Sequence, residues 1–474
     1  MIQKVFYFPQ TFPIFQEAHD FFVNTKKQTA TQHLFTNKQL RTLLVPIMVE
    51  QLLSSLMGTA DTMMVSNVGS AAISAVSLVD AINILVIQAL SALAAGGAIL
   101  CSQYLGSQNL KKAKRSAEQV LFVMLVLSCS LSLLCLIFRF PLLRLIFGTV
   151  DTDVMANSQI YFFFTLLSFP FIGLYDAGAS ILRAQNNTKG PMTISILSNF
   201  LNIGGNAILI FVFGMGVAGA AISTLVSRIF CAIVVIWQLR NPAEQIYVRN
   251  YFSIRPDWSL IKRVLFIGIP SGIENSMFQF GKLAIQSTVS TLGTVAIAAQ
   301  AMTSILEALN GIAAMGVGIG LMTVVGQCIG AKRKDEAIYY IKRLSWLSEI
   351  VILISCPVVY LLAKPVTILG GMEAESARLC LQMVAFITIT KPISWVLSFI
   401  PAYGMRAAGD VKFSMITSCC TMWACRFCLC VFLIRVLGFG PMGVWIGMFA
   451  DWTVRGIIFT WRFHSRKWLE HKVI

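Results

Sequence analysis

The chain has 474 residues, of which 57% are hydrophobic and only 12% are charged, and its formal net charge is +16. A soluble protein carries about 25% charged residues, so the composition excludes an ordinary soluble domain and indicates a protein that crosses a membrane many times. The positive charge does not indicate nucleic-acid binding, because Lys and Arg lie in short loops between apolar runs, as in the cytoplasmic loops of membrane proteins.

In chain order, residues 1–38 contain no clean apolar run before a cleavage site and are predicted to be a cytoplasmic tail. A spanning helix needs about 20 apolar residues, and twelve later segments qualify. The predicted spans are 41–67, 71–105, 116–139, 157–182, 190–213, 217–239, 260–291, 295–329, 340–362, 378–405, 412–436 and 441–463. Six lie in a first lobe, 39–239, and six in a second, 260–463. The stretch 240–259 is predicted to be a cytoplasmic linker, and 464–474 a cytoplasmic tail.

The basic residues of the loops predict the orientation. With both termini in the cytoplasm, the inner loops carry 18 Lys and Arg residues and the outer loops carry five. Cytoplasmic loops of membrane proteins are enriched in these residues. The predicted location is therefore the inner (plasma) membrane, with both termini cytoplasmic.

The chain also repeats itself. Residues 46–106 align without a gap onto residues 270–330, at an offset of 224 positions, and 14 of the 61 pairs are identical. The identical pairs include Pro46 with Pro270, Glu50 with Glu274 and Gln103 with Gln327. Two halves with an even number of spans predict parallel lobes around a central cleft. The predicted fold is an all-α polytopic membrane protein with twelve transmembrane helices in two six-helix lobes.

Polar side chains inside the spans are functional candidates, because an ionisable group there costs about 2.5–3.5 kcal/mol on insertion scales. In the first half, the candidates for cation or proton coupling are Asp61, Asp176, Asn199, Asn202, Asn206 and Thr224. Asn202 and Asn206 are four residues apart and share one helix face. Asp61 with these two amides is a possible Na⁺ site, since a carboxylate supplies hard oxygen ligands. The alternative is a hydrogen-bond network that only holds helices together.

Glu50 and Glu274 each lie four residues after a Pro, in corresponding places of the two halves. A Pro kinks a helix, and a kink beside a carboxylate suits a bend that depends on an ion or a proton. We expect Glu274 to act in coupling, with Glu50 and Glu307 as secondary candidates. A shared packing contact is the alternative, and Lys282, about 80° around the helix, is a possible counterion of Glu274.

Other features predict no catalysis. The chain has no Gly-rich phosphate-binding motif with Lys-Ser/Thr, and its His residues lie in the tails or at a helix end. We expect no enzyme and no cofactor. The Gly run 316–320 and the pair Cys425/Cys428 are interpreted as helix packing. Lys391 and Arg455 are candidates for snorkelling toward the membrane surface.

Several motifs in both halves resemble the multidrug and toxic compound extrusion (MATE) transporters. They are GTADTMMVSNVGSAAISAVS (58–77), GSQNLKKAKR (106–115), RAQNNTKGPM (183–192), SNFLNIGGNAILI (198–210), IGIPSGIE (267–274) and GQCIGAKRKDEA (326–337). The resemblance covers about residues 40–465. It implies two six-helix lobes that rock to expel substrates in exchange for Na⁺ or H⁺.

The resemblance also implies roles for single residues. Asp61 matches the first-helix carboxylate of the family's N-lobe cation site, Asn202 an amide ligand and Thr224 a hydroxyl ligand. Asn206 stands where the family usually has an Asp, and Asp176 where some relatives have an Asn. The two carboxylates are therefore expected in a swapped arrangement.

In the second half, Glu274 matches the seventh-helix Glu of members that couple through that lobe. The tenth-helix Asp of those members falls near Trp395, so its partner is missing, and the coupling ion stays open between Na⁺ and H⁺.

The resulting hypothesis is a monomeric antiporter, embedded in the lipid bilayer, that exports amphipathic, often cationic, organic compounds by alternating access. One alternative is a lipid-linked saccharide flippase of the same superfamily, which twelve spans and an acidic cleft disfavour. Another is a membrane channel or scaffold without coupled transport.

Overall fold

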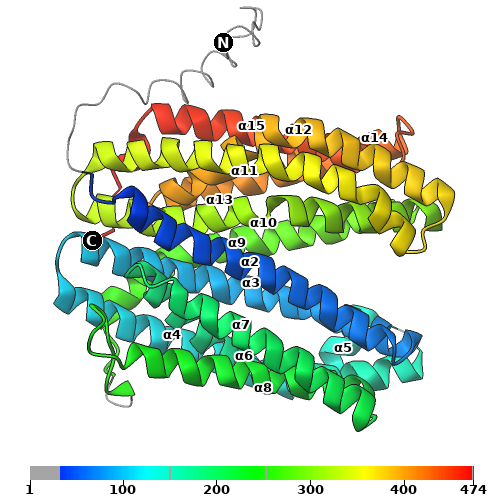
Figure 1. Cartoon of the computed structure of the whole chain (residues 1–474), viewed down its shortest axis with the longest axis horizontal. Helices are drawn as coiled ribbons and strands as arrows, with labels where there is room; N and C mark the ends of the chain where they lie inside the picture. Colours follow the sequence, from blue (N-terminus) through cyan, green and yellow to red (C-terminus); the bar gives the residue numbers. More distant parts are fainter. Residues whose placement is uncertain (1–32, 149–150, 252–253, 472) are drawn as a thin grey trace, which may run out of the picture.

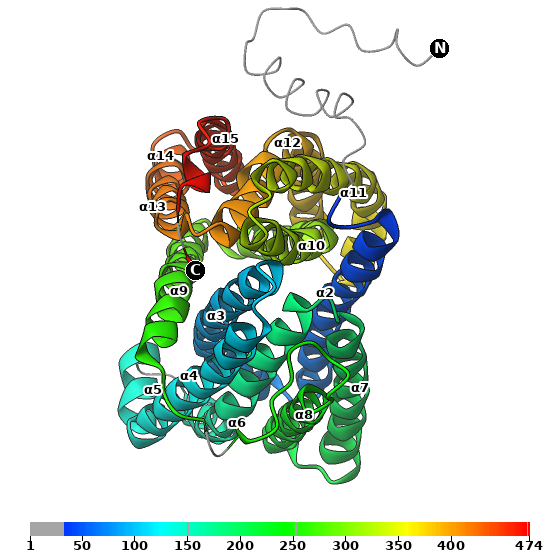
Figure 2. The ribbon, with the colours of Figure 1, turned by 90° about the vertical axis from the view of Figure 1, so that its left-hand side faces the viewer.

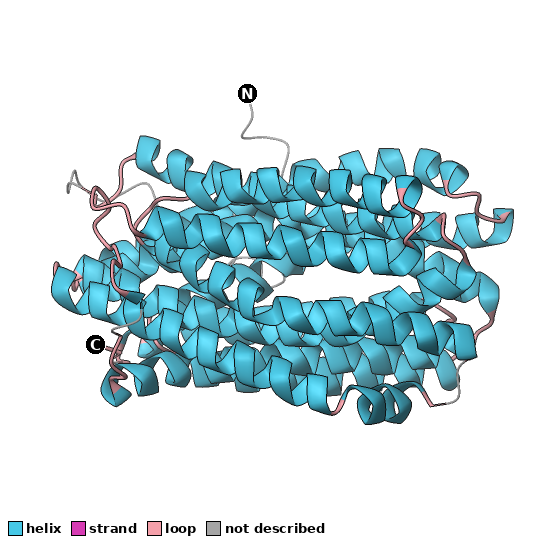
Figure 3. Cartoon of the chain, turned by 90° about the horizontal axis from the view of Figure 1, so that it is seen from below, coloured by secondary structure: helices cyan, strands magenta, loops and turns pink. Residues whose placement is uncertain are grey.

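The structure is a computed structural model that describes residues 33–148, 151–251, 254–471 and 473–474. This part of the chain is helical and contains no strand (Figure 3). Of the predicted tail 1–38, residues 1–32 lie outside the described residues. The long helices are α2 (Asn37–Ser66), α3 (Ser70–Gly106), α4 (Leu110–Ile137), α6 (Thr152–Ala184), α7 (Lys189–Asn206), α8 (Gly216–Leu239), α9 (Trp258–Ser290), α10 (Thr294–Gly330), α11 (Lys334–Leu369), α12 (Ala374–Ala407) and α15 (Met442–His464).

The remaining elements are short. They are α5 (Arg139–Phe147), α13 (Val411–Thr421), α14 (Leu429–Arg435), the π-helical segments η2 (Ala207–Val212) and η4 (Met422–Cys428), and the 3₁₀ helix η5 (Lys467–Leu469). The segment η2 continues α7, and η4 joins α13 to α14, so each completes one long helix. The apolar pattern does not predict α5, because its nine residues are too few to cross a membrane.

Nine helices of the described part of the chain are long and apolar enough to cross a membrane. They are Ser70–Gly106, Leu110–Ile137, Thr152–Ala184, Lys189–Val212, Gly216–Leu239, Thr294–Gly330, Lys334–Leu369, Ala374–Ala407 and Val411–Arg435. The helices α2, α9 and α15 occupy the other three predicted spans. Each has 23 residues or more, which is about 35 Å of helix, but they are less apolar or more charged.

The helices begin and end where local chemistry predicts. At the start of α2, Thr36 and Gln39 form a capping box in which each side chain accepts a hydrogen bond from the other residue's backbone N–H. The Asn109 side chain accepts from Lys112 N at the start of α4, and Asp257 accepts from Ser259 N at the start of α9. These side chains satisfy N–H groups that the helix itself leaves without a partner.

The helices run roughly parallel in one bundle (Figure 1). Viewed along the bundle, α3 and α10 are adjacent near the centre, with α9 and α2 on opposite sides of them (Figure 2). Around α3 pack α4, α6 and α8, and around α10 pack α11 and α12. The helix α9 packs mainly on α3, and α2 packs on α10 as well as α7. The first helix of each half therefore packs against the central helix of the other half: α2 against α10, and α9 against α3.

The repeat is visible in the backbone. Residues 224 positions apart share a positive φ, as in Gln108 (57°) with Lys332 (61°) and Gly69 (138°) with Gly293 (90°). The glycines Gly214 (64°) and Gly438 (69°) follow the same offset. A positive φ is uncommon outside glycine. Its recurrence at Gln108 and Lys332 therefore indicates that the two halves share the same turn conformation at this place.

Four turns, 107–109, 185–188, 331–333 and 408–410, lie at one end of the bundle beside many Lys and Arg residues, and we call this the basic end. Here α3 and α10 touch so closely that a Cβ on Gly106 would lie 2.0 Å from the Gln327 carbonyl oxygen. A Cβ on Gly330 would lie 2.0 Å from the Gln103 carbonyl oxygen. Only glycine allows this approach, and it closes the basic end between the halves.

The side chains of the two Gln residues strengthen this closure. Gln103 Nε2 donates to the Ala407 carbonyl oxygen at the end of α12 (2.7 Å). Gln327 Nε2 donates to the Ala184 carbonyl oxygen at the end of α6 (2.8 Å). Each Gln thus satisfies a C-terminal carbonyl of the opposite half. In the predicted Gly run, Gly316 contacts Met48, so its interpretation as close helix packing is confirmed.

Candidate functional site

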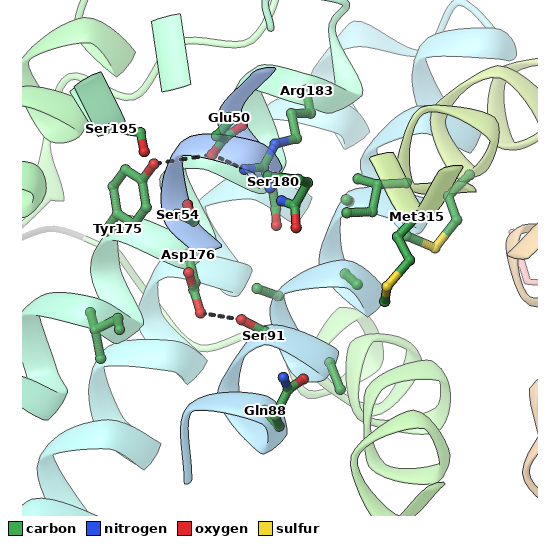
Figure 4. Close-up of a pocket in the computed structure, with 18 of the residues that line it drawn as sticks. Glu50, Ser54, Gln88, Ser91, Tyr175, Asp176, Ser180, Arg183, Ser195 and Met315 are labelled. Atoms are coloured by element: carbon green, nitrogen blue, oxygen red, sulfur yellow. Dashed lines mark hydrogen bonds and ion pairs between the residues drawn. The ribbon is translucent and has the colours of Figure 1, made fainter. Parts of the chain in front are cut away.

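A cavity of about 490 Å³ lies between the halves and is lined by α2, α3, α6, α7 and α8 on one side and α9, α10 and α12 on the other. Figure 4 shows Glu50, Asp176 and Arg183 at its wall, with Gln88 and Met315 farther along it. Its lining is mixed, with several polar groups among Ala, Ile and Met side chains. Pockets of this size and composition accommodate small organic molecules.

The predicted first-half site is partly assembled around Asp61. Asn206 Nδ2 donates to Asp61 Oδ1 (2.7 Å) and to Asn202 Oδ1 (3.3 Å), and Asn202 Nδ2 donates to Thr224 Oγ1 (3.3 Å). The helices α2, α7 and α8 therefore bring four of the predicted residues into one chain of hydrogen bonds. Both Asn side chains are fully buried.

This chain of hydrogen bonds is incomplete in a way that suits a cation. The Asn206 Oδ1 atom is buried and has no hydrogen-bond partner in the described structure. A buried acceptor without a donor costs about 1–3 kcal/mol. The oxygens of Asp61, Asn202, Asn206 and Thr224 are hard ligands of the kind that alkali and alkaline-earth cations prefer. A Na⁺ ion, or a proton on Asp61, fits this donor set.

Asp176 and Asn199 do not join this group. Asp176 Oδ2 accepts from Ser91 Oγ (2.6 Å) at the wall of the central cavity (Figure 4). Asn199 Nδ2 donates to the Leu53 carbonyl oxygen (3.3 Å). The hydrogen bonds therefore place Asp176 with the cavity, apart from the network that joins Asp61 to the two amides.

Two further charged residues belong to this region. Arg228 on α8 donates to Ser168 Oγ (2.6 Å), and its charge interacts with the carboxylates of Asp61, Asp80 and Asp176. Asp80 Oδ1 accepts from Asn83 Nδ2 (3.1 Å) and from the Tyr161 hydroxyl (3.3 Å). The sequence predicts both residues to be charges inside spans. Only the packing of the helices in the structure shows that they lie near Asp61 and Asp176.

The repeat-related glutamates form repeat-related ion pairs. Arg183 Nη2 lies 2.5 Å from Glu50 Oε1, and Arg406 Nη2 lies 2.6 Å from Glu274 Oε1. The two Arg residues are themselves 223 positions apart. The second carboxylate oxygen of each Glu is buried without a hydrogen-bond partner in the described structure. Arg406, not Lys282, is the contacting counterion of Glu274. Lys282 lies eight residues farther along α9, which is about 12 Å of helix.

Glu307 has a dedicated partner. Lys391 Nζ lies 2.7 Å from Glu307 Oε1 and 2.9 Å from the Glu307 carbonyl oxygen, and its side chain is fully buried. Arg455 pairs with Asp451 on the same helix (3.1 Å), and both side chains are at most 1% exposed. The expectation that Lys391 and Arg455 snorkel is therefore wrong. Each is held inside the bundle by a carboxylate and aromatic rings.

The MatE family model matches residues 46–208 and 270–432. These two segments together cover well over half of the chain, and they begin and end 224 residues apart, as the repeat does. The chain belongs to the MatE family.

Relatives of this MatE protein are membrane transporters and not enzymes. It is 28% identical to the uncharacterized transporter YisQ of Bacillus subtilis, over 90% of this chain and 93% of the relative. It is 25% identical to the probable multidrug resistance protein NorM of Thermotoga maritima, over 92% of this chain and 94% of the relative. A mutant of the Vibrio cholerae MATE transporter VcmN has the same fold, with a TM-score of 0.84 at 20% identity, over 92% of this chain and 98% of that one.

Proposed function

We propose that this MatE protein is a Na⁺- or H⁺-coupled antiporter that exports amphipathic, often cationic, organic molecules. The observation that carries the proposal is the group around Asp61, where a carboxylate, two buried amides and a hydroxyl share one hydrogen-bond chain that leaves an amide oxygen without a donor. The cavity between the halves, with Asp176 at its wall, supplies a place for the organic substrate.

The proposed architecture has twelve spans in two lobes, 39–239 and 260–463, joined by the linker 240–259. The two equal matches to the family model support this division. Both termini and the basic end face the cytoplasm in this proposal, in accord with the distribution of Lys and Arg. The protein acts as a monomer in the plasma membrane.

The proposed cycle starts from the closed basic end. In this state the organic substrate leaves the cavity toward the opposite side of the membrane, and a cation or proton reaches Asp61. To shift an equilibrium between two states from 1:99 to 99:1 takes about 5.5 kcal/mol of differential binding. In this proposal the Asp61 carboxylate binds a cation in one state of the transporter and contacts only Asn206 in the other. The difference in electrostatic energy between these two states is of this order.

Opening of the basic end toward the cytoplasm then requires the reciprocal contacts of Gln103 and Gln327 to break. Along α2, the Glu50–Arg183 pair lies between these contacts and Asp61, and the Glu274–Arg406 pair lies at the corresponding place on α9. We infer that they hold the proline-containing helices α2 and α9 in place while the halves move.

The test is ethidium efflux from proteoliposomes that contain the full chain, driven by a Na⁺ gradient or by a pH gradient. We expect efflux with one of the two gradients and little without either. Flux that ignores both gradients would indicate a channel, and no flux of ethidium or any other lipophilic cation would favour the flippase.

A further inference from the structure

The second half of the membrane interior carries more basic than acidic charge. Away from the helix ends, the basic residues of α9, α12, η4 and α15 are Lys282, Lys391, Arg426 and Arg455. The acids that face them are Glu307 and Asp451, since Glu274 is bound to Arg406. Lys391 contacts Glu307 and Arg455 contacts Asp451. Lys282 and Arg426 contact no carboxylate in the part of the chain that the structure describes.

Arg426 is incompletely satisfied. Its Nε atom is buried without a hydrogen-bond partner among the described residues. It lies in the π-helical segment η4, whose backbone packs against Gly447 of α15. π-helical turns inside α-helices occur frequently at functional sites.

Lys282 lies on α9 beside the segment η4 that carries Arg426. A Cβ on Gly281 would lie 2.3 Å from the Met422 side chain, so α9 and η4 touch at this level. The charges of Lys282 and Arg426 repel each other, both are attracted by Glu307, and Arg426 is attracted more strongly by Asp451. Lys282 is exposed on the face of α9 opposite the exposed apolar residues Ile273 and Phe280. It therefore points away from lipid, toward the space between the halves.

The repeat shows what these two charges replace. Arg426 lies 224 residues after Asn202, an amide of the predicted cation site, and Lys282 lies 224 residues after Gly58, three residues from Asp61. In turn, Asp61 corresponds to Ile285. The region that gathers cation ligands in the first half thus carries two positive charges in the second half.

We propose that Lys282 and Arg426 form a subsite for the carboxylate or phosphate group of an amphipathic substrate. Two unpaired cations inside a membrane protein are costly, and an organic anion between them forms charge-assisted hydrogen bonds that offset this cost. Lys282 is eight residues from the end of α9 and Asp61 five from the end of α2, so both lie about 8–12 Å from the end opposite the basic one. A substrate that reaches both this subsite and Asp61 would therefore carry both signs of charge.

This inference rests on the proposed export function, and a matched pair of dyes separates the two. Rhodamine B carries a carboxylate, and rhodamine B ethyl ester is the same cation without it. Binding of each to the purified full chain is measured by fluorescence anisotropy, and efflux from proteoliposomes is measured beside it.

We expect Lys282→Gln and Arg426→Gln to weaken rhodamine B binding by about tenfold or more and ester binding by less than about twofold. Arg426→Lys keeps the charge and should retain most of the affinity for rhodamine B. Lys364→Gln, an exposed Lys at the opposite end from the basic turns, is the matched control and should leave both dyes unaffected.

Competition identifies the anion. Displacement of rhodamine B by benzoate or by phenyl phosphate distinguishes carboxylate from phosphate preference. Weaker rhodamine B binding in vesicles with phosphatidylglycerol than in phosphatidylcholine alone, lost in Lys282→Gln, would identify a lipid headgroup as the anion.

An equal loss for both dyes, or unchanged rhodamine B binding in both Gln variants, would overturn the subsite. In that case, gradient-driven efflux of the ester would still support the export function. If neither dye nor ethidium is exported, the export function fails, while the binding measurements still decide the subsite.

Discussion

At the scale of single residues, Asp61 differs from the glutamates that form ion pairs inside the bundle. Glu50, Glu274 and Glu307 each contact a basic side chain, whereas Asp61 contacts the amide of Asn206. An acid neutralised by a fixed Arg or Lys has little to gain from a cation or proton. A carboxylate held by neutral groups has much more to gain. We propose Asp61 for coupling because its hydrogen-bond chain also contains Asn202, Asn206 and Thr224.

Asp61→Asn removes the charge and retains the shape. We expect gradient-driven ethidium efflux to fall by about tenfold or more, because one tenfold step corresponds to only about 1.4 kcal/mol of lost coupling energy. Equilibrium binding of ethidium should change little. The control is Asp153→Asn, an exposed acid at the start of α6, and parental efflux in Asp61→Asn would contradict the assignment.

The Glu274–Arg406 pair makes a separate prediction about stability. Glu274→Gln leaves Arg406 without its counterion and should destabilise the protein by about 3 kcal/mol, measured as thermal unfolding in detergent. Replacing both residues with Met removes both charges and should cost less than the single change. If the double variant is the less stable one, the intact ion pair is net stabilising and this prediction is wrong.

At the scale of elements, the two halves have the same turns, close glycine contacts and helix prolines at corresponding places. The turns at Gln108 and Lys332 share a left-handed backbone, and Gly106 and Gly330 each meet the backbone of the other half. Prolines Pro46 and Pro270 lie inside α2 and α9. The halves differ in the polar side chains placed on this common frame, so the proposed cation site of one half and the proposed anion subsite of the other lie at corresponding places of the repeat.

Gly106→Ala tests the contact between α3 and α10. The added Cβ meets backbone, which cannot rotate away, so we expect a cost of about 1–3 kcal/mol that is relieved when the basic end opens. Spin labels at exposed positions 111 and 334, near the basic end, should show a longer distance in the variant. Gly204→Ala adds a Cβ with nothing within 4 Å and should leave the distance unchanged.

At the scale of the whole molecule, the halves meet mainly toward the basic end. Gly96 contacts Gly268, Gly316 contacts Met48 and Gly326 contacts Ser102, all in the halves of their helices nearer to that end. At the other end, added Cβ atoms on Gly58, Gly69 and Gly293 would meet nothing within 4 Å. We therefore expect the central cavity to communicate with the side opposite the basic end.

The reactivity of introduced cysteines tests from which side of the membrane the cavity is accessible. In a background without the native cysteines, Gln88→Cys at the cavity wall should react with a membrane-impermeant thiol reagent added from outside the cell. Lys111→Cys, an exposed position near the basic end, should react only from the cytoplasmic side. Reaction of Gln88→Cys from the cytoplasmic side alone would show that the dominant state is open at the basic end.

Much of this architecture was predictable from the sequence because it depends on one-dimensional properties. Apolarity over about 20 residues predicts a helix in lipid wherever it lies, and the offset of 224 needs no coordinates. Asn202 and Asn206 share a face because the helix period is fixed, and their link to Asp61 follows the family resemblance. The bounds of the long helices accordingly agree with the predicted spans to within several residues at most ends.

The sequence by itself determined the membrane class, the repeat and the kinds of polar residue that enter the bilayer. The tertiary structure decided which of them meet. Glu274 binds Arg406, 132 residues away, instead of Lys282, and Arg228 lies among three acids from other helices. Such pairings depend on how far each helix is rotated and tilted against its neighbours, and that is settled by packing across the whole bundle, not by any one segment of it.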